Sequence, residues 1–329
     1  MGRHVEVLAL IVLVAAAAIA QGPSPPSAVA HQSLDDAWWT GPLLAPSAAT
    51  LPRGHVLIEP YIYDVTMQGF YNSSGARVGT PHANSFGSLT YINYGMINRF
   101  TIGLIPTFGY NDPREGLSSA GIGLGDVTVQ AQYGLSRFRE GHWMPATSIN
   151  VQETLPTGRY DRLGARPSDG FGAGAYTTTV GMFSQTYFWL PNGRILRGRF
   201  NVQQGFSSNV NVEDVSVYGT AEGFRGHANP GSTLFVDLAG EYSVTRKWVL
   251  ALDAMYRHQG NTAVTGYDTL DSNQPVRFNS GLSQQYGFAP AIEYNWSSKV
   301  GVIFGTRFIG PGRNTARTIT PVVAVNYVH

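Results

Sequence analysis

The spacing of strand-like segments constrains this chain more than any other feature. Segments of about ten residues alternate with gaps that are by turns short and long. The short gaps are 95–98, 138–143, 191–194, 245–246 and 297–298. The long gaps are 69–82, 111–122, 157–172, 207–231, 260–281 and 310–316. Five short and six long gaps predict twelve strands with both chain ends on one side. Short turns at one rim and long loops at the other are typical of a closed transmembrane β-barrel.

The first residues have the features of a secretory leader. Met1–His4 carries positive charge, Val5–Ala18 is an apolar run, and Ala18-Ile19-Ala20 is a small-residue cleavage site. We therefore expect residues 1–20 to be a signal peptide, with Ala28-Val29-Ala30 as a later alternative site. No later stretch reaches the roughly 20 apolar residues of a spanning helix. A chain that spans the membrane must then do so as a closed barrel, because lipid cannot satisfy an open sheet edge.

Composition agrees with a barrel of the bacterial outer membrane. Charged residues make up 13% of the chain and aromatic residues 12%, as suits a wall that faces lipid between aromatic girdles. There is no cysteine, so disulfides and cysteine-ligated metals are excluded. The net charge of +1 comes without any basic block, which argues against a nucleic-acid partner.

Period-two alternation predicts which side chains face lipid. Trp248, Leu250 and Leu252 alternate with Ala251 and Asp253, and the strand-like segments 234–244, 127–135 and 300–308 behave alike. A charge on the lipid face is costly, so the charged set is assigned to the lumen. A soluble β-sandwich also alternates, but it does not explain the leader and the loop order together. The segments 144–156 and 173–190 mix polar residues into the apolar face, and a bulge is one way to reset their register.

Charged residues on the inner faces are the candidate functional residues. We expect Glu59 inside, together with a channel-lining set: Asp126, Arg197, Arg199, Asp237, Glu241, Asp253, Arg257, Glu293 and Arg307. Opposed charges in a narrow pore create a transverse field that sets selectivity. The alternative is that these charged side chains pair across the lumen and fill it. We expect Asp237, Asp253 or Glu241 to approach Arg257.

The segment between the leader and the first strand leaves two alternatives open. Residues 21–54 are rich in Pro, Ala and Ser and form a periplasmic segment or enter the mouth of the barrel, which then occupies 55–329. Trp38-Trp39 and Leu43-Leu44 are too apolar for a simple linker. They predict either an interfacial anchor or a contact with a plug.

Two short motifs carry a family resemblance. Gly123-Leu124-Gly125-Asp126-Val127-Thr128 opens one strand, and Leu155-Pro156-Thr157-Gly158-Arg159-Tyr160-Asp161 closes the next. In this order they resemble the outer-membrane channel proteins grouped around the meta-cleavage pathway of phenol degradation. The resemblance implies a transmembrane barrel and a link to aromatic solutes. The terminal His329 departs from the aromatic residue usual in such barrels. A purely structural explanation is that both motifs shape the barrel rim and touch no ligand.

The sequence shows no catalytic, metal or cofactor motif. The histidines have no ligand spacing, and Gly121-x-Gly123-x-Gly125 lacks the strand–turn–helix context of a nucleotide site. We expect a passive outer-membrane channel for small, aromatic or hydrophobic solutes, surrounded by outer-membrane lipid. The alternatives are a lipid-modifying enzyme with a site at the outer rim, and a barrel with a sealed lumen. Oligomeric state cannot be read from the sequence.

Overall fold

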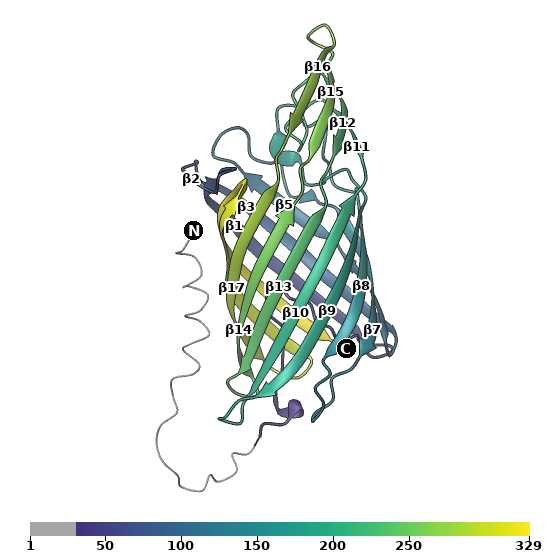
Figure 1. The fold of residues 1–329 in the computed structure, drawn as a ribbon, viewed down its shortest axis with the longest axis vertical. Coiled ribbons are helices and arrows are strands. Elements are labelled where there is room, and N and C mark those ends of the chain that lie inside the picture. The colour runs from purple at the N-terminus through teal and green to yellow at the C-terminus, as the bar shows by residue number, and fades with distance from the viewer. Residues whose placement is uncertain (1–30) are drawn as a thin grey trace.

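The computed structural model describes residues 31–329, so the expected signal peptide lies outside the described residues. The fold is a barrel with a small sheet above it (Figure 1). The barrel elements are β1 (Val56–Tyr71), β3 (Ala83–Ile97), β4 (Phe100–Ile105), β5 (Thr107–Asp112), β6 (Gly123–Leu124), β7 (Val127–Ser136), β8 (Ala146–Leu155), β9 (Thr177–Trp189), β10 (Ile195–Ser207), β13 (Thr233–Ser243), β14 (Trp248–Gln259), β17 (Ser283–Asn295), β18 (Val300–Arg313) and β19 (Thr315–Val328). The minor elements are η1 (Leu34–Asp36), β2 (Arg77–Val78) and η2 (Pro167–Asp169).

Twelve antiparallel strands close the barrel, as the loop rhythm predicts. β4 and β5 form one crossing interrupted at Pro106, and β6 and β7 form another interrupted at the two residues Gly125-Asp126. Closure comes from β1, which pairs with β3 on one side and with β19 on the other. Since no edge is left open, every crossing strand satisfies its backbone groups within the wall.

The two ends of the barrel differ as expected. The C-terminus lies at the short-turn end, and two of the long loops rise above the other end as a four-stranded sheet (Figure 1). That sheet is formed by β11 (Val210–Glu213), β12 (Phe224–Asn229), β15 (Ala263–Asp268) and β16 (Gln274–Asn279). By the usual topology of such barrels this is the outer end. We call the small sheet the outer sheet.

The sequence-based prediction of a loop at 310–316 is wrong. β18 continues to Arg313 and β19 starts at Thr315, so the two strands turn at Asn314 alone, whose φ is +44°. Gly310 and Pro311 suggested a break, but both lie within a paired strand, beside a register shift between Gln285 and Gly287. A bulge tolerates the proline because it releases the backbone donor from the ladder.

Side chains alternate across the wall in the predicted sense. Leu250 and Leu252 are 50% and 45% exposed on the outside, whereas Val249, Ala251 and Asp253 are buried inside. The registers of β8 with β9 and of β9 with β10 run without a shift, and the one register shift of β8 lies against β7, where Gly134 and Ser136 flank an extra residue. Glu153 stays on the outer face, where the Thr178 hydroxyl donates to its carboxylate at 2.6 Å. This hydrogen bond gives both the Thr178 hydroxyl and the Glu153 carboxylate a partner near the outer rim.

A charge placed on the outer face tests this assignment. We expect Leu252→Arg to destabilise the folded barrel by about 2–4 kcal/mol, because the guanidinium would face hydrocarbon. Arg257→Glu, on the inner face of the same strand, is the matched control and should fold normally. Heat-modifiable gel mobility and urea unfolding in lipid vesicles measure both. If Leu252→Arg folds normally and Arg257→Glu does not, the two faces of the strand have been assigned the wrong way round.

Candidate functional site in the barrel lumen

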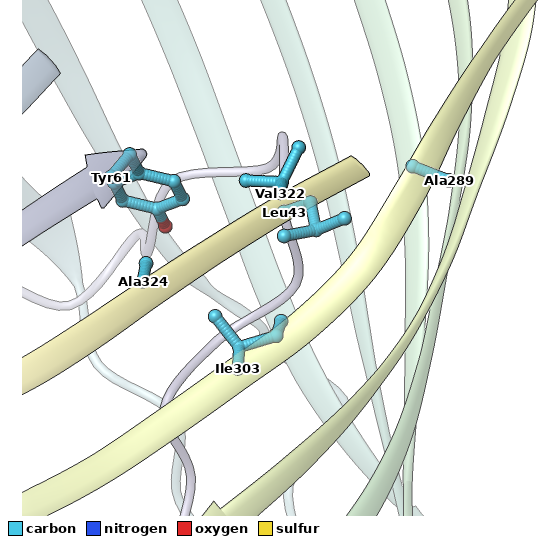
Figure 2. Close-up of a cluster of buried hydrophobic side chains, with 6 residues drawn as sticks. All are labelled: Leu43, Tyr61, Ala289, Ile303, Val322 and Ala324. Atoms are coloured by element: carbon cyan, nitrogen blue, oxygen red, sulfur yellow. The ribbon is translucent and has the colours of Figure 1, made fainter. Parts of the chain in front are cut away.

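The N-terminal segment lies inside the barrel rather than below it. Residues 37–51, which we call the plug segment, enter from the short-turn end, and Ala37, Leu43, Ala45 and Ala48 are buried there. Figure 2 shows Leu43 against side chains from four wall strands, namely Tyr61, Ala289, Ile303, Val322 and Ala324. Of the two alternatives that the sequence left open for this segment, the structure shows entry into the barrel, and Leu43 is a plug contact.

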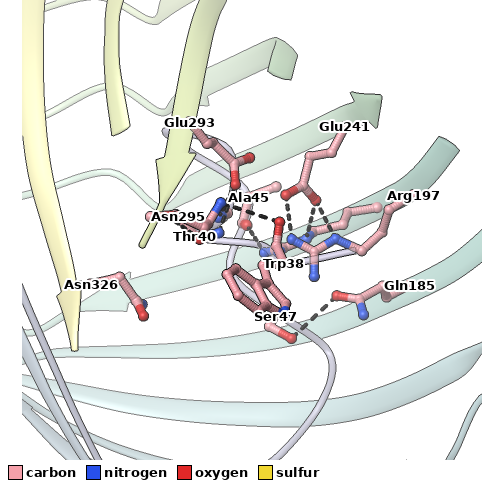
Figure 3. Close-up of polar contacts among 12 residues, drawn as sticks. Trp38, Thr40, Ala45, Ser47, Gln185, Arg197, Glu241, Glu293, Asn295 and Asn326 are labelled. Atoms are coloured by element: carbon pink, nitrogen blue, oxygen red, sulfur yellow. Dashed lines mark hydrogen bonds and ion pairs between the residues drawn. The ribbon is translucent and has the colours of Figure 1, made fainter. Parts of the chain in front are cut away.

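Two carboxylates of the wall bind the backbone of the plug segment. Glu293 Oε2 accepts hydrogen bonds from the amides of Thr40 at 2.6 Å and Gly41 at 3.2 Å (Figure 3). Asp253 accepts from three further amides at 3.0–3.3 Å, those of Leu43, Leu44 and Ala45. Consecutive backbone N–H groups that converge on an anion form a concave anion-binding nest. Here the wall supplies the anions and the plug segment supplies the donors.

Positive and polar wall groups bind the opposite side of the plug segment. Arg199 Nη1 donates to the Ala45 carbonyl at 2.7 Å, and Asn201 Nδ2 donates to the Pro46 carbonyl at 2.9 Å. The ring of Trp39 lies 4.4 Å from the Arg197 guanidinium, within the range of a cation–π contact. Donors on one side and acceptors on the other therefore hold the plug segment in one position.

Glu241 joins the two arginines of β10 in a buried ion triad. Arg197 Nε donates to Glu241 Oε2 at 2.6 Å, its Nη2 contacts Oε1, and Arg199 Nε lies 3.1 Å from Oε2. The register aligns Arg197 directly with Glu241 on the neighbouring strand β13. All three residues are at most 6% exposed. The carboxylate of Glu241 thus offsets one of the two guanidinium charges, so neither arginine is a free charge in the lumen.

Five of the nine predicted lining residues contact the plug segment or one another beside it. Arg197, Arg199, Glu241, Asp253 and Glu293 cluster around the plug segment. Asp237 is buried on the same inner surface, Glu59 accepts from Asn326 at 3.3 Å, and Arg257 and Arg307 lie further outward. No carboxylate approaches Arg257 among the described residues, contrary to the expectation. Asp253 lies four residues away along an extended strand, about 13 Å. The register places Asp237 opposite Met255 and Glu241 opposite Ala251, so neither is opposite Arg257.

Asp126 ties loops together and does not point free into the lumen. Its two carboxylate oxygens accept from the amides of Gly158 at 2.9 Å and Ala173 at 2.7 Å. The Thr157 hydroxyl adds a bond to the Gly125 carbonyl at 3.0 Å. A Cβ on Gly158 would meet the Gly172 backbone at 2.7 Å, so only glycine fits this crossing. The two motifs that carried the resemblance therefore interlock at the outer rim, which supports a structural role for both.

An apolar core and ion pairs connect the outer sheet to the neighbouring loop. Val210, Val212, Phe224, Ala228 and Val264 form its apolar core together with Ala175. Glu213 pairs with Arg162 at 2.5 Å and with Arg225 at 3.0 Å. Burial raises the pKa of Tyr218 to about 12, so its hydroxyl remains protonated and donates to the Ala173 carbonyl at 2.5 Å. These contacts fix the sheet over the outer mouth.

Three adjoining cavities follow the interior from the outer loops to the short turns. The outer cavity, about 460 Å³, lies below the outer sheet between Tyr218 and Gln285. The middle cavity, about 460 Å³, shares Gln285 with it and reaches Leu44 of the plug segment. The inner cavity, about 360 Å³, shares Leu44 with the middle one and runs beside the plug segment to Ser298 in a short turn. The three cavities therefore adjoin one another along the interior, and residues of the plug segment line the middle and inner ones.

Sequence reasoning missed the plug backbone as a functional element. The interaction uses main-chain amides of an irregular segment, which leave no periodicity or residue-type signal. The only available signals were the apolar Leu43-Leu44 pair and the excess of acids on the inner faces. The described residues include no helix long and apolar enough to cross a membrane. Residues 31–329 also contain no group of three or more potential ligand side chains arranged around a metal position.

Comparison with solved structures supports the fold. The chain is similar to the crystal structure of an outer-membrane channel from Pseudomonas putida F1, at 15% identity and a TM-score of 0.66, covering 87% of this chain and 100% of that one. A TodX monoaromatic hydrocarbon channel aligns at 11% identity and a TM-score of 0.39, over 89% of this chain and 95% of that one. No curated protein matches the chain in sequence.

A family model matches most of the barrel. The match runs over residues 67–327, from the outer part of β1 almost to the end of β19. It includes both motifs that interlock at the outer rim and all of the predicted lining residues except Glu59. The matched region exceeds half of the chain. The chain therefore belongs to the family described as "Putative MetA-pathway of phenol degradation".

Proposed function

We propose that the protein is a passive outer-membrane channel for small, aromatic or hydrophobic solutes. The observation that carries the proposal is the series of three adjoining cavities, which leads from below the outer sheet to the short turns. Lining side chains include Tyr91, Phe235 and Met255 beside Gln152 and Gln203, so the walls offer apolar contact and hydrogen bonds. Movement through such a path needs only a concentration gradient.

The solute class rests on the family and on the chemistry of the walls. The family description names a phenol-degradation pathway, and phenol is a small aromatic ring with one polar group. A path with alternating apolar and amide-bearing walls suits such molecules better than it suits large sugars. We propose that the charged residues around the plug segment act in conduction by holding that segment, and that Arg257 and Arg307 line the open part of the path.

Planar-bilayer recording of the purified full-length mature protein tests the proposal. We expect discrete, small conductance steps in potassium chloride, with heat-denatured protein as the control. Small steps follow from a twelve-stranded barrel, which lies between filled eight-stranded barrels and open porins, and from the plug segment within it. Lipid hydrolysis without conductance would instead favour an enzyme at the outer rim. Absence of both would favour a sealed barrel.

A further inference from the structure

The middle cavity contains two arginines that have no counter-charge. Arg257 on β14 and Arg307 on β18 both line it, on strands separated only by β17. Within residues 31–329 neither guanidinium takes part in an ion pair. Arg307 Nε is buried and has no hydrogen-bond partner in the described part of the chain. A buried N–H donor normally has an acceptor, and Arg307 Nε lacks one, whereas the Arg257 side chain is exposed.

The inner lumen differs from the middle cavity because acids lie beside its arginines. Arg197 and Arg199 both lie within ion-pair distance of Glu241, which offsets one of their two positive charges. The described residues that line the middle cavity include no aspartate or glutamate. Acids are therefore concentrated around the plug segment, while the chamber outside it carries a net positive charge. An anion from solution is the partner that this chamber lacks.

The remaining walls indicate what kind of anion fits. Phe235, Met255, Ile309 and Leu44 supply apolar surface, and Gln285 and Gln203 supply amide groups. A volume of about 460 Å³ is within the range of small-molecule sites. Inorganic anions would leave the apolar walls unused. A carboxylate with a ring or short hydrocarbon body would use both, since guanidinium forks match carboxylate geometry and the body would contact the apolar side chains.

We propose that the middle cavity is a binding site for small organic carboxylates, with Arg257 and Arg307 as the carboxylate-binding residues. The inference rests on the proposed function in that it assigns a solute class to one chamber of the path. It also has a consequence for transport: the site concentrates aromatic or short aliphatic acids immediately outside the plug segment. Neutral analogues would lack the contact with the arginines and would pass without being held there.

Calorimetric titration of the detergent-solubilised full-length protein with benzoate tests the site. Benzyl alcohol, of similar shape but neutral, is the comparison ligand. We expect saturable benzoate binding and at least tenfold weaker binding of benzyl alcohol. Arg257→Gln/Arg307→Gln should weaken benzoate binding by about tenfold or more, as expected for charge-assisted hydrogen bonds. Arg114→Gln/Arg277→Gln, which removes the same charge from an exposed loop position and an exposed position of the outer sheet, should leave it unchanged.

Two results would overturn the site, and neither depends on conductance. One is equal binding of benzoate and benzyl alcohol, and the other is unchanged benzoate binding by a folded Arg257→Gln/Arg307→Gln variant. Should that variant fail to fold, the Arg257→Lys/Arg307→Lys variant keeps the charge but loses the fork, and undiminished benzoate binding would count against the site. Benzoate binding without bilayer conductance would refute the proposed channel and support the carboxylate site. Conductance without benzoate binding would support the channel and refute the site.

Discussion

Removal of the plug segment should increase single-channel conductance by about threefold or more, since a twelve-stranded barrel without internal chain approaches an open pore. A variant that lacks residues 31–51 keeps every barrel strand intact. Asp253 and Glu293 would then lose their backbone donors, but water entering the lumen would solvate both carboxylates. Planar-bilayer recording at one salt concentration compares the two proteins.

A reversible crosslink provides the control for this deletion. A Cβ on Gly301 of β18 would lie 2.1 Å from Thr40 Oγ1, and the native chain has no cysteine. Thr40→Cys/Gly301→Cys brings the two sulfur atoms into contact, and a small displacement of the plug segment that relieves the close approach should allow one disulfide between plug segment and wall. We expect the oxidised protein to keep the lowest conductance and the reduced protein to show larger openings. If the deletion leaves conductance unchanged, the plug segment does not limit the path.

Glu241→Ala should lower the free energy of unfolding by about 3–5 kcal/mol, because it leaves buried guanidinium groups without their carboxylate. Glu241 is 0% exposed and binds both Arg197 and Arg199, so solvent cannot replace it easily. Urea unfolding in lipid vesicles, followed by heat-modifiable mobility, measures the loss. Glu222→Ala, at an exposed loop position, is the matched control and should have little effect.

A double substitution distinguishes loss of the ion pair from a general loss of packing. Arg197→Gln/Glu241→Gln removes one charge of each sign. Arg199 is then the one charge of the triad without a partner, whereas loss of Glu241 alone leaves two. Residues in one network are non-additive, and we expect the pair to cost less than the sum of the two single changes. An additive result would mean that Arg197 and Glu241 do not stabilise the barrel through each other.

Local sequence pattern determined the wall of this protein. Alternation predicted the outward position of Leu250 and Leu252 and the inward position of Asp253, because a strand with lipid on one side tolerates charge only on the other. The lengths of the gaps predicted twelve strands and the outer end. The pattern was wrong at 310–316, where Gly310 and Pro311 lie in a bulged strand instead of a loop. Residue type alone does not distinguish a bulge from a turn.

Tertiary structure decided what the inner charges do. Register places Arg197 opposite Glu241 but Arg257 opposite Gln285, so one arginine is neutralised and the other is left free. The outer sheet likewise joins two loops that are separate in sequence. The position of the plug segment depends on Asp253 and Glu293, which follow it by more than 200 residues. A sequence can specify the face of a strand through local periodicity, but partners across a lumen are set only when the closed barrel brings distant strands together.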